Sequence, residues 1–180
     1  MEFRETRIKG CFEIKADMYR DHRGVFVKTF QEVVCAEHGI HMKLSEQYFS
    51  VSKKGVLRGL HFQVPPFAQN KLVTIISGRV FDVVVDLRRG SPTYGEFETF
   101  ELDADKGGVL YIPQGLAHGF QALTDDAILG YQVSSIYSPE HDRGVRWNSA
   151  GIPWPMEPTI MADRDNKFVG VKEYESPFLA

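Results

Sequence analysis

Short runs of β-forming residues, each separated from the next by Gly, Pro or Asp, constrain the fold of this 180-residue chain more than any other feature. Residues 71–77, 79–88 and 95–102 have the composition of strands, and residues 109–112 and 127–133 continue the pattern. Runs of this length and spacing are typical of a β-sandwich or barrel. Residues 96–102 also alternate polar and apolar side chains, as a strand with one solvent-facing side does. The sequence therefore predicts a mostly-β fold.

The remaining segments fit one domain. The Ser77-Gly78 link suits a hairpin turn between the first two strands, because glycine adopts the positive φ that such turns require. Only residues 31–38 favour a helix, and it is short. Residues 149–180 are rich in Pro and charge, which predicts an extended tail that wraps the barrel and contains one short helix. Since no repeat or linker interrupts the chain, we predict a single domain over residues 1–180.

Composition excludes several classes of partner. The chain is 43% hydrophobic and 25% charged, with a formal net charge of −3, which indicates a globular protein without affinity for nucleic acid. No apolar stretch approaches the roughly 20 residues that span a bilayer, and the N-terminus lacks a secretory signal. Cys11 and Cys35 follow no metal or redox spacing. Reduced thiols are typical of a cytoplasmic protein, which is our prediction.

Two segments carry most of the chemical information: Val56-Leu-Arg-Gly-Leu-His-Phe-Gln63 and Gly107-Gly-Val-Leu-Tyr-Ile-Pro-Gln-Gly-Leu-Ala-His-Gly-Phe120. The second resembles a motif of the cupin barrels, in which the final histidine, here His118, usually binds a metal. The first cupin motif needs His-x-His and a nearby glutamate, whereas this chain has His61, Phe62 and Gln63. Three of the four expected ligands are absent. We therefore predict an all-β, cupin-like jelly-roll that uses no metal and works with side chains.

His61 is the first candidate for that chemistry. In a regular strand it shares a face with Leu57 and Gln63, and a polar face in a small barrel points into a cavity. The alternative is a structural histidine held by hydrogen bonds. Charged residues inside a barrel are costly unless they pair or bind a ligand, which favours a functional role. The charged residues near His61 in this pattern are Arg58, Lys71, Asp82 and Asp86.

For the other candidate residues, a purely structural role explains the sequence as well as a functional one does. His118 could be held by backbone carbonyls at a barrel corner. Tyr131 and Tyr137 could be core residues with satisfied hydroxyls. Arg23 alone would belong to a solvated loop, but Arg23, Arg58 and Lys71 together suit a diphosphate, because guanidinium groups bind phosphate oxygens at two points.

Taken in order, the motifs resemble those of the nucleotide-sugar 3,5-epimerase family over roughly residues 8 to 168. The segments that carry this resemblance are Asp21-x-Arg-Gly24, Val56 to Gln63, Lys71-Leu-Val, Val80 to Gly95, Leu110 to Phe120, Tyr137-Ser-Pro-Glu-x-x-x-Gly144-x-x-Trp147 and Met161-Ala-Asp-Arg-Asp165. The resemblance implies a jelly-roll homodimer that inverts C3 and C5 of a nucleotide-linked 4-keto-6-deoxyhexose in deoxysugar biosynthesis, without a metal or dissociable cofactor.

The resemblance also implies roles for individual residues. His61 is the general base, Asp165 orients it, Tyr131 is the acid on the opposite face, and Lys71 stabilises the enolate. The implied substrate-binding residues are Arg23, Lys28, Gln47, Arg58, Gln63, His118 and Tyr137, of which Arg23 and Arg58 hold the diphosphate.

These side chains suit the reaction. A 4-keto sugar has acidic C–H bonds at C3 and C5, because loss of either proton leaves an enolate on the C4 oxygen. Histidine has an ordinary pKa of about 6.5 and is a suitable base, and a carboxylate behind it fixes its tautomer. Tyrosine is a neutral donor, and a cation beside the oxyanion is typically the larger electrostatic contribution.

Two positions depart from the commonest family sequence. Lys28 stands where a glutamate is frequent, and the run Glu46-Gln-Tyr-Phe49 replaces Gln-Asp-Asn-His. Both changes lie in the expected nucleotide-side wall, so dTDP, CDP and GDP sugars all remain open. Inversion of one carbon instead of two also remains open. Two other classes are a non-catalytic sugar-nucleotide binding barrel, which the intact acid–base set disfavours, and a metal-dependent cupin, which the missing His-x-His disfavours.

Overall fold

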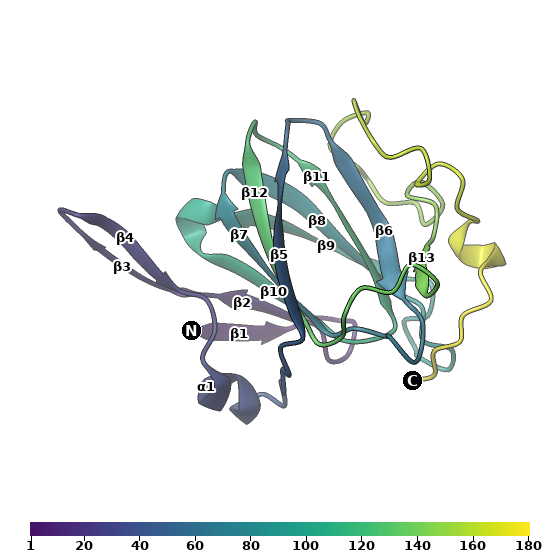
Figure 1. Ribbon diagram of the computed structural model, residues 1–180, viewed down its shortest axis with the longest axis horizontal. Coiled ribbons are helices and arrows are strands. Elements are labelled where there is room, and N and C mark those ends of the chain that lie inside the picture. The colour runs from purple at the N-terminus through teal and green to yellow at the C-terminus, as the bar shows by residue number, and fades with distance from the viewer.

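The computed structural model describes residues 1–180 as a sandwich of two β-sheets with a projecting hairpin and a long C-terminal tail (Figure 1). The all-β prediction is confirmed. The strands are β1 Glu2–Glu5, β2 Phe12–Lys15, β3 Asp17–Asp21, β4 Gly24–Lys28, β5 Glu46–Ser52, β6 Leu57–Gln63, β7 Lys71–Ser77, β8 Arg79–Asp86, β9 Phe97–Asp103, β10 Gly108–Ile112, β11 Leu116–Ala122, β12 Ala127–Val133 and β13 Asp142–Gly144. The helices are α1 Glu32–Glu37 and the 3₁₀ turns η1 Ala104–Lys106 and η2 Val171–Glu173.

The chain crosses repeatedly between the sheets, as a jelly-roll does. One sheet has the order β1-β2-β10-β7-β12-β5 and the other β13-β6-β11-β8-β9. The predicted hairpin at Ser77-Gly78 is wrong, because β7 and β8 belong to opposite sheets and the link carries the chain across the sandwich. Gly78 does have a positive φ of 73°, and a Cβ there would lie 2.3 Å from the Thr124 hydroxyl. The glycine is therefore required, although for a crossing and not for a hairpin.

The inner faces of both sheets form the main core. Val84 and Phe120 from one sheet pack in the same cluster as Leu110 and Leu129 from the other, and all four are buried. Residues two apart along a strand point to the same face. Because β12 places Ala127, Leu129, Tyr131 and Val133 in this core, Tyr131 faces the interior of the sandwich.

Helix α1 and the chain around it cover part of the outer face of the six-stranded sheet. Cys35 of this helix and Ile40 just after it pack against Leu72 and Tyr111. The helix predicted over residues 31–38 is confirmed as Glu32–Glu37. All three helices have only three to six residues, and none has the length and apolar character that a membrane crossing requires.

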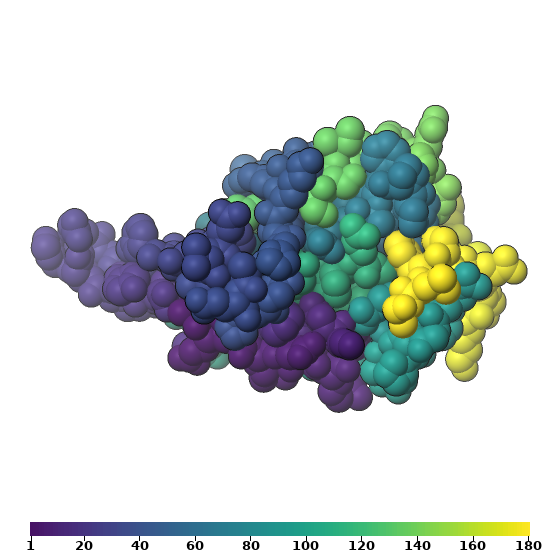
Figure 2. Space-filling view, turned by 90° about the horizontal axis from the view of Figure 1, so that it is seen from below, coloured from purple at the N-terminus to yellow at the C-terminus, as the bar shows by residue number.

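Strands β3 and β4 pair only with each other and extend away from the sandwich (Figures 1 and 2). The ladder joins Asp17 to Lys28 and Asp21 to Gly24, so that Arg23 lies in the turn at the tip. Tyr19 and Phe26 face each other on this hairpin and are 57% and 63% exposed.

The C-terminal tail wraps the outer face of the five-stranded sheet. Ile152, Val171 and Phe178 pack against Phe62 and other outward residues of that sheet. At its end the backbone N–H of Arg89 donates to the carbonyl of Phe178 at 3.0 Å. The predicted extended tail with one short helix is confirmed, with η2 as the helix. On its way the tail passes β6 and brings Asp165 to that strand.

Candidate active site

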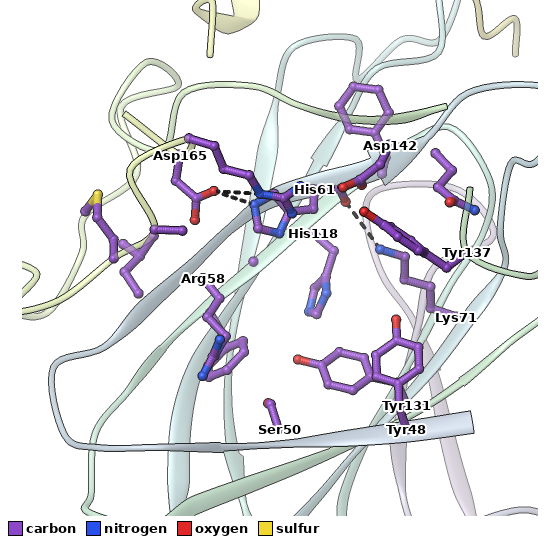
Figure 3. A pocket seen from close by; sticks show the side chains of 18 of the residues that line it. Tyr48, Ser50, Arg58, His61, Lys71, His118, Tyr131, Tyr137, Asp142 and Asp165 are labelled. Atoms are coloured by element: carbon purple, nitrogen blue, oxygen red, sulfur yellow. Dashed lines mark hydrogen bonds and ion pairs between the residues drawn. The ribbon is translucent and has the colours of Figure 1, made fainter. Parts of the chain in front are cut away.

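A pocket of about 670 Å³, lined by both polar and hydrophobic residues, opens between the two sheets. This volume suits a small-molecule ligand. Strands β5, β7 and β12 supply one wall and β6 and β11 the other, and the tail segment 160–165 closes a third side. Eight of the eleven predicted site residues line it: Gln63 and, as labelled in Figure 3, Arg58, His61, Lys71, His118, Tyr131, Tyr137 and Asp165.

His61 and Asp165 form the hydrogen-bonded pair at the rim of this pocket. The Nε2 atom of His61 lies 2.8 Å from Oδ1 of Asp165. Asp165 is 1% exposed, and its other oxygen accepts the backbone N–H of Gly59 at 3.4 Å. The carboxylate is thus fixed from two directions, and it leaves Nδ1 of His61 free to accept a proton from a ligand.

The strands around β6 explain how His61 is presented. It lies directly opposite His118 of β11 on one side and Gly144 of β13 on the other. A Cβ at Gly144 would come within 2.3 Å of the Phe168 ring, so the glycine leaves room for that ring. Phe168 in turn packs edge-on against the imidazole, with ring centroids 5.9 Å apart.

The predicted face of β6 needs one correction. The register of β6 with β11 shifts between His118 and Phe120, so Arg58 opposes Phe120 and Leu57 opposes Gln121. Opposed residues share a face, and Phe120 belongs to the inner core. Arg58 therefore shares the inner face of β6 with His61, where regular alternation predicts Leu57, although Leu57 also lines the pocket.

Tyr131 lies on β12, in the sheet opposite His61, with its ring 9% exposed. Burial raises the pKa of its phenol well above the ordinary value of 10, so the hydroxyl is a neutral donor at pH 7. Its ring stacks on Tyr48 with centroids 4.9 Å apart, and the ring of His118 meets it edge-on at 6.2 Å.

Lys71 is a buried amine at the pocket's inner end. Its Nζ donates to the backbone carbonyl of His61 at 3.3 Å. Burial lowers its pKa to about 8, and the carboxylates of Asp142 and Asp82 limit the fall. The ammonium form therefore still predominates at pH 7, where it can stabilise an oxyanion.

His118 is bonded to the fully buried Asp82, whose two oxygens both lie 2.9 Å from its Nε2. Burial raises the pKa of Asp82, and the neighbouring His118 opposes that shift. Because both members are buried, this second His–Asp pair also supports the fold.

Three other predicted pocket residues differ in what they offer a ligand. Arg58 is exposed; its Nε donates to the Ser52 hydroxyl at 3.1 Å and its Nη2 to the carbonyl of Val51 at 3.4 Å, which leaves Nη1 free for a ligand. Gln63 donates to two backbone carbonyls and accepts from the N–H of Ser138 at 2.6 Å, so its amide shapes the wall instead of facing a ligand. Tyr137 is 54% exposed at the mouth.

Arg23, Lys28 and Gln47 do not line the pocket of their own chain. Arg23 and Lys28 belong to the projecting hairpin, where Arg23 pairs with Asp21. Gln47 alternates with the pocket residues Glu46 and Tyr48 along β5 and points to the outer face.

Asp142 and Arg164 are pocket residues that the sequence analysis missed. Arg164 forms a salt bridge with Asp142 and lies 3.6 Å from Asp165. Arg164 thereby links the carboxylate of Asp142, near Lys71, to the carboxylate of Asp165, which is bonded to His61. Asp142 occupies an unassigned position of the Tyr137-to-Gly144 motif, and Arg164 directly precedes Asp165. The feature of the sequence that could have identified Asp142 and Arg164 is that both are charged residues within these motifs.

This arrangement suits proton transfer at carbon. A base oriented by a carboxylate and a neutral phenol approach one cavity from opposite sheets, with a cation between them at its inner end (Figure 3). No three His, Cys, Asp or Glu side chains are grouped as metal ligands.

The sandwich and its pocket define a jelly-roll sugar epimerase, and solved structures of that class have the same fold. The dTDP-6-deoxy-D-glucose-3,5-epimerase of Legionella pneumophila Philadelphia 1, in complex with dTDP-4-keto-L-rhamnose, is similar with a TM-score of 0.93 and 33% identity over 99% of this chain and 98% of that one. More specifically, the chain belongs to the dTDP-4-dehydrorhamnose 3,5-epimerase family, whose family model matches residues 5–173.

Curated relatives agree with this assignment. The dTDP-4-dehydrorhamnose 3,5-epimerase of Methanothermobacter thermautotrophicus is 40% identical over 179 residues, which cover 96% of each chain. A protein of Streptomyces niveus named dTDP-4-dehydrorhamnose 3-epimerase is also 40% identical, over 168 residues that cover 92% of this chain and 81% of the relative. The family resemblance found in the motifs is therefore confirmed.

Proposed function

We propose that this protein converts dTDP-4-dehydro-6-deoxyglucose to dTDP-4-dehydrorhamnose by inverting C3 and C5, as one domain and without a dissociable cofactor. The observation that carries the proposal is the position of His61 and Tyr131, which come from opposite sheets to one pocket. Inversion at carbon requires a base on one face of the sugar and an acid on the other. His61 and Tyr131 can approach a bound sugar from opposite sides in this way.

The proposed chemistry proceeds through an enolate. Nδ1 of His61 takes the proton from C3 or C5, the C–H electron pair enters the ring bond to C4, and the C4 carbonyl oxygen becomes an oxyanion. The ammonium group of Lys71 stabilises that oxyanion. Tyr131 then gives its phenolic proton to the carbon from the other face, and the oxyanion returns to the C4 carbonyl. Solvent takes the extra proton from the His61 imidazolium and gives one to the Tyr131 phenolate. Asp165 keeps His61 in one orientation throughout.

The nucleotide diphosphate is proposed to bind at the mouth of the pocket. The Nη1 group of Arg58 is free to donate there, and Tyr137 offers an exposed ring for stacking on a base. The ligand bound to the Legionella relative carries thymidine diphosphate, which favours dTDP over CDP or GDP for this chain.

A second candidate function is inversion at one carbon only. The Streptomyces niveus relative is named a 3-epimerase, and its identity to this chain equals that of the Methanothermobacter 3,5-epimerase. Since overall identity does not separate the two activities, product stereochemistry must.

We also propose a homodimer in the cytoplasm. An isolated two-stranded hairpin is only marginally stable in water, and β3–β4 exposes Tyr19, Val25 and Phe26 beyond the body (Figure 2). A second subunit would cover these side chains, and an exchanged hairpin would carry Arg23 and Lys28 toward the neighbouring pocket. The two cysteines are unpaired, which fits a reducing compartment.

Solvent-exchange experiments test the assignment of base and acid. In D₂O, His61→Asn is expected to abolish deuterium uptake at both carbons. Tyr131→Phe is expected to retain uptake, because His61 returns a solvent-derived deuteron to the same face, but to lose inversion. Inversion by Tyr131→Phe at the wild-type rate would contradict the proposal.

A further inference from the structure

Tyr48 is a pocket residue to which the proposed reaction assigns no role. It lies on β5, the edge strand of the six-stranded sheet, directly opposite Tyr131 on β12. The two rings stack with centroids 4.9 Å apart and an interplanar angle of 22°. Figure 3 shows the pair side by side on the pocket wall away from His61. Tyr48 is 42% exposed, whereas Tyr131 is 9% exposed.

The orientation of Tyr131 depends on contacts of its ring. Ser50 lies two residues along β5 from Tyr48, close enough for its hydroxyl to limit the rise in the pKa of Tyr131. That hydroxyl is buried and forms no hydrogen bond of regular geometry, so Ser50 alone does not fix the direction of the phenol. The aromatic neighbours of Tyr131 are Tyr48, in a stacked arrangement, and His118, which meets it edge-on at 6.2 Å. His118 is itself fixed by Asp82, so its side of the ring is rigid. On the side of the Tyr131 ring that faces solvent, Tyr48 is the aromatic residue that packs against it.

We propose that Tyr48 is a positioning residue, whose ring packs on Tyr131 and holds its hydroxyl in line with the carbon that is reprotonated. The inference rests on the proposed function, in which Tyr131 is the acid. Proton transfer is sensitive to alignment, so a displacement of the donor by a fraction of an ångström slows it. Stacked aromatic rings attract each other beyond the area they bury, so the stack with Tyr48 resists such a displacement of Tyr131.

This role makes a specific prediction about the fate of the enolate. Once formed, the enolate receives a proton either from Tyr131, which inverts the carbon, or from His61 on the original face, which gives exchange without inversion. A displaced Tyr131 loses this competition, while proton removal by His61 is unaffected. The number of inversions per exchange event therefore reports the position of Tyr131, and a loss of overall stability would not change that ratio.

The experiment compares three variants in D₂O with dTDP-4-dehydro-6-deoxyglucose as substrate. Tyr48→Phe keeps the ring stack and removes the hydroxyl, whereas Tyr48→Leu removes the stack. Phe49→Leu is the matched control, since Phe49 is the next residue of β5, is 67% exposed and points to the outer face. Deuterium uptake and inversion are followed together by proton NMR, and kcat and KM are measured separately.

Tyr48→Leu is expected to lower the ratio of inversion to exchange on the order of tenfold, through kcat and not through KM. Tyr48→Phe and Phe49→Leu are expected to keep the wild-type ratio. An unchanged ratio in Tyr48→Leu overturns the inference, and so does an equal fall in Tyr48→Phe, which would assign the effect to the hydroxyl. If the wild-type protein shows no exchange, the proposed function itself fails, and that result is distinct from both.

Discussion

Asp165 and His61 are 104 residues apart in the sequence and are joined by a 2.8 Å hydrogen bond. The tail brings the carboxylate to β6, where it is buried and also accepts the N–H of Gly59. A buried carboxylate that is held by a backbone donor cannot rotate away from the imidazole. The position of His61, the proposed base, thus depends on the last fifth of the chain as much as on the strand that carries it.

Asp165→Asn is expected to lower kcat on the order of 10² to 10⁴-fold, because the amide no longer orients the imidazole or stabilises its protonated form. The fold should persist, since asparagine fills the same space. Steady-state kinetics and a thermal melt measure both effects. Asp163→Asn is the matched control, because Asp163 is an exposed aspartate two residues away. Equal activity of the two variants would show that the carboxylate does not support the base.

The pH dependence of kcat/KM, which reports the pKa values of the free enzyme, is expected to show an alkaline limb near pH 8. Burial lowers the pKa of Lys71 to about 8, so the ammonium group that we propose to stabilise the enolate is lost as pH rises through that value. The pKa of Tyr48 is about 12 and that of Tyr131 is raised further, so neither phenol titrates in this range. A profile that is flat to pH 10 would contradict the role of Lys71.

Stability should change in the opposite direction over the same range. Because the pKa of Lys71 is lower in the folded state than its unfolded value near 10.4, the unfolded state binds more protons between these values. The contribution of this group to the free energy of unfolding therefore rises from pH 8 to pH 10. Urea denaturation at the two pH values, compared with Lys71→Met, isolates that contribution and separates lost catalysis from alkaline unfolding.

His118→Ala is expected to lower the free energy of unfolding by roughly 3–5 kcal/mol, because it leaves the carboxylate of Asp82 buried without its partner. Replacing both residues with leucine should recover most of that loss, since a well-packed apolar pair can substitute for a buried ion pair. Urea denaturation of the two proteins measures the difference. A loss below about 1 kcal/mol in the single variant would show that Asp82 is not stabilised by His118.

Phe26→Asp is expected to convert the proposed dimer to a monomer. Phe26 is 63% exposed on a hairpin with no other sheet to support it, and a charge there would oppose burial against a second subunit. Light scattering measures the mass, with Tyr94→Asp as a control at an exposed aromatic residue outside the hairpin. A wild-type protein that is monomeric at micromolar concentration would contradict the dimer.

The sequence predicted the strands well, because Val-rich runs and intervening glycines define them locally. Residues 71–77 form a strand with the predicted bounds. Pairing between strands could not be predicted in the same way. A turn glycine such as Gly78 serves a hairpin and a sheet crossing equally, and only the packed core decides between them.

The side-chain directions on β6 and β5 show a second limit. A one-position shift of register exchanges the faces of a strand, which is why Arg58 takes the place on the inner face of β6 that regular alternation predicts for Leu57. Gln47 was identified through a family motif that does not specify the direction of its side chain. Arg23 and Lys28 are placed on the hairpin, so any contact they make with substrate depends on assembly. Asp142 was missed because its role depends on Arg164 from the tail.

Proton NMR of the wild-type protein with dTDP-4-dehydro-6-deoxyglucose in D₂O tests the central claim most directly. The account predicts that the C3 and C5 proton signals both disappear and that the product is dTDP-4-dehydrorhamnose. Loss of one signal alone would assign the single-carbon activity. Retention of both signals with the dTDP, CDP and GDP sugars would contradict the claim that His61 and Tyr131 form an acid–base pair for epimerisation.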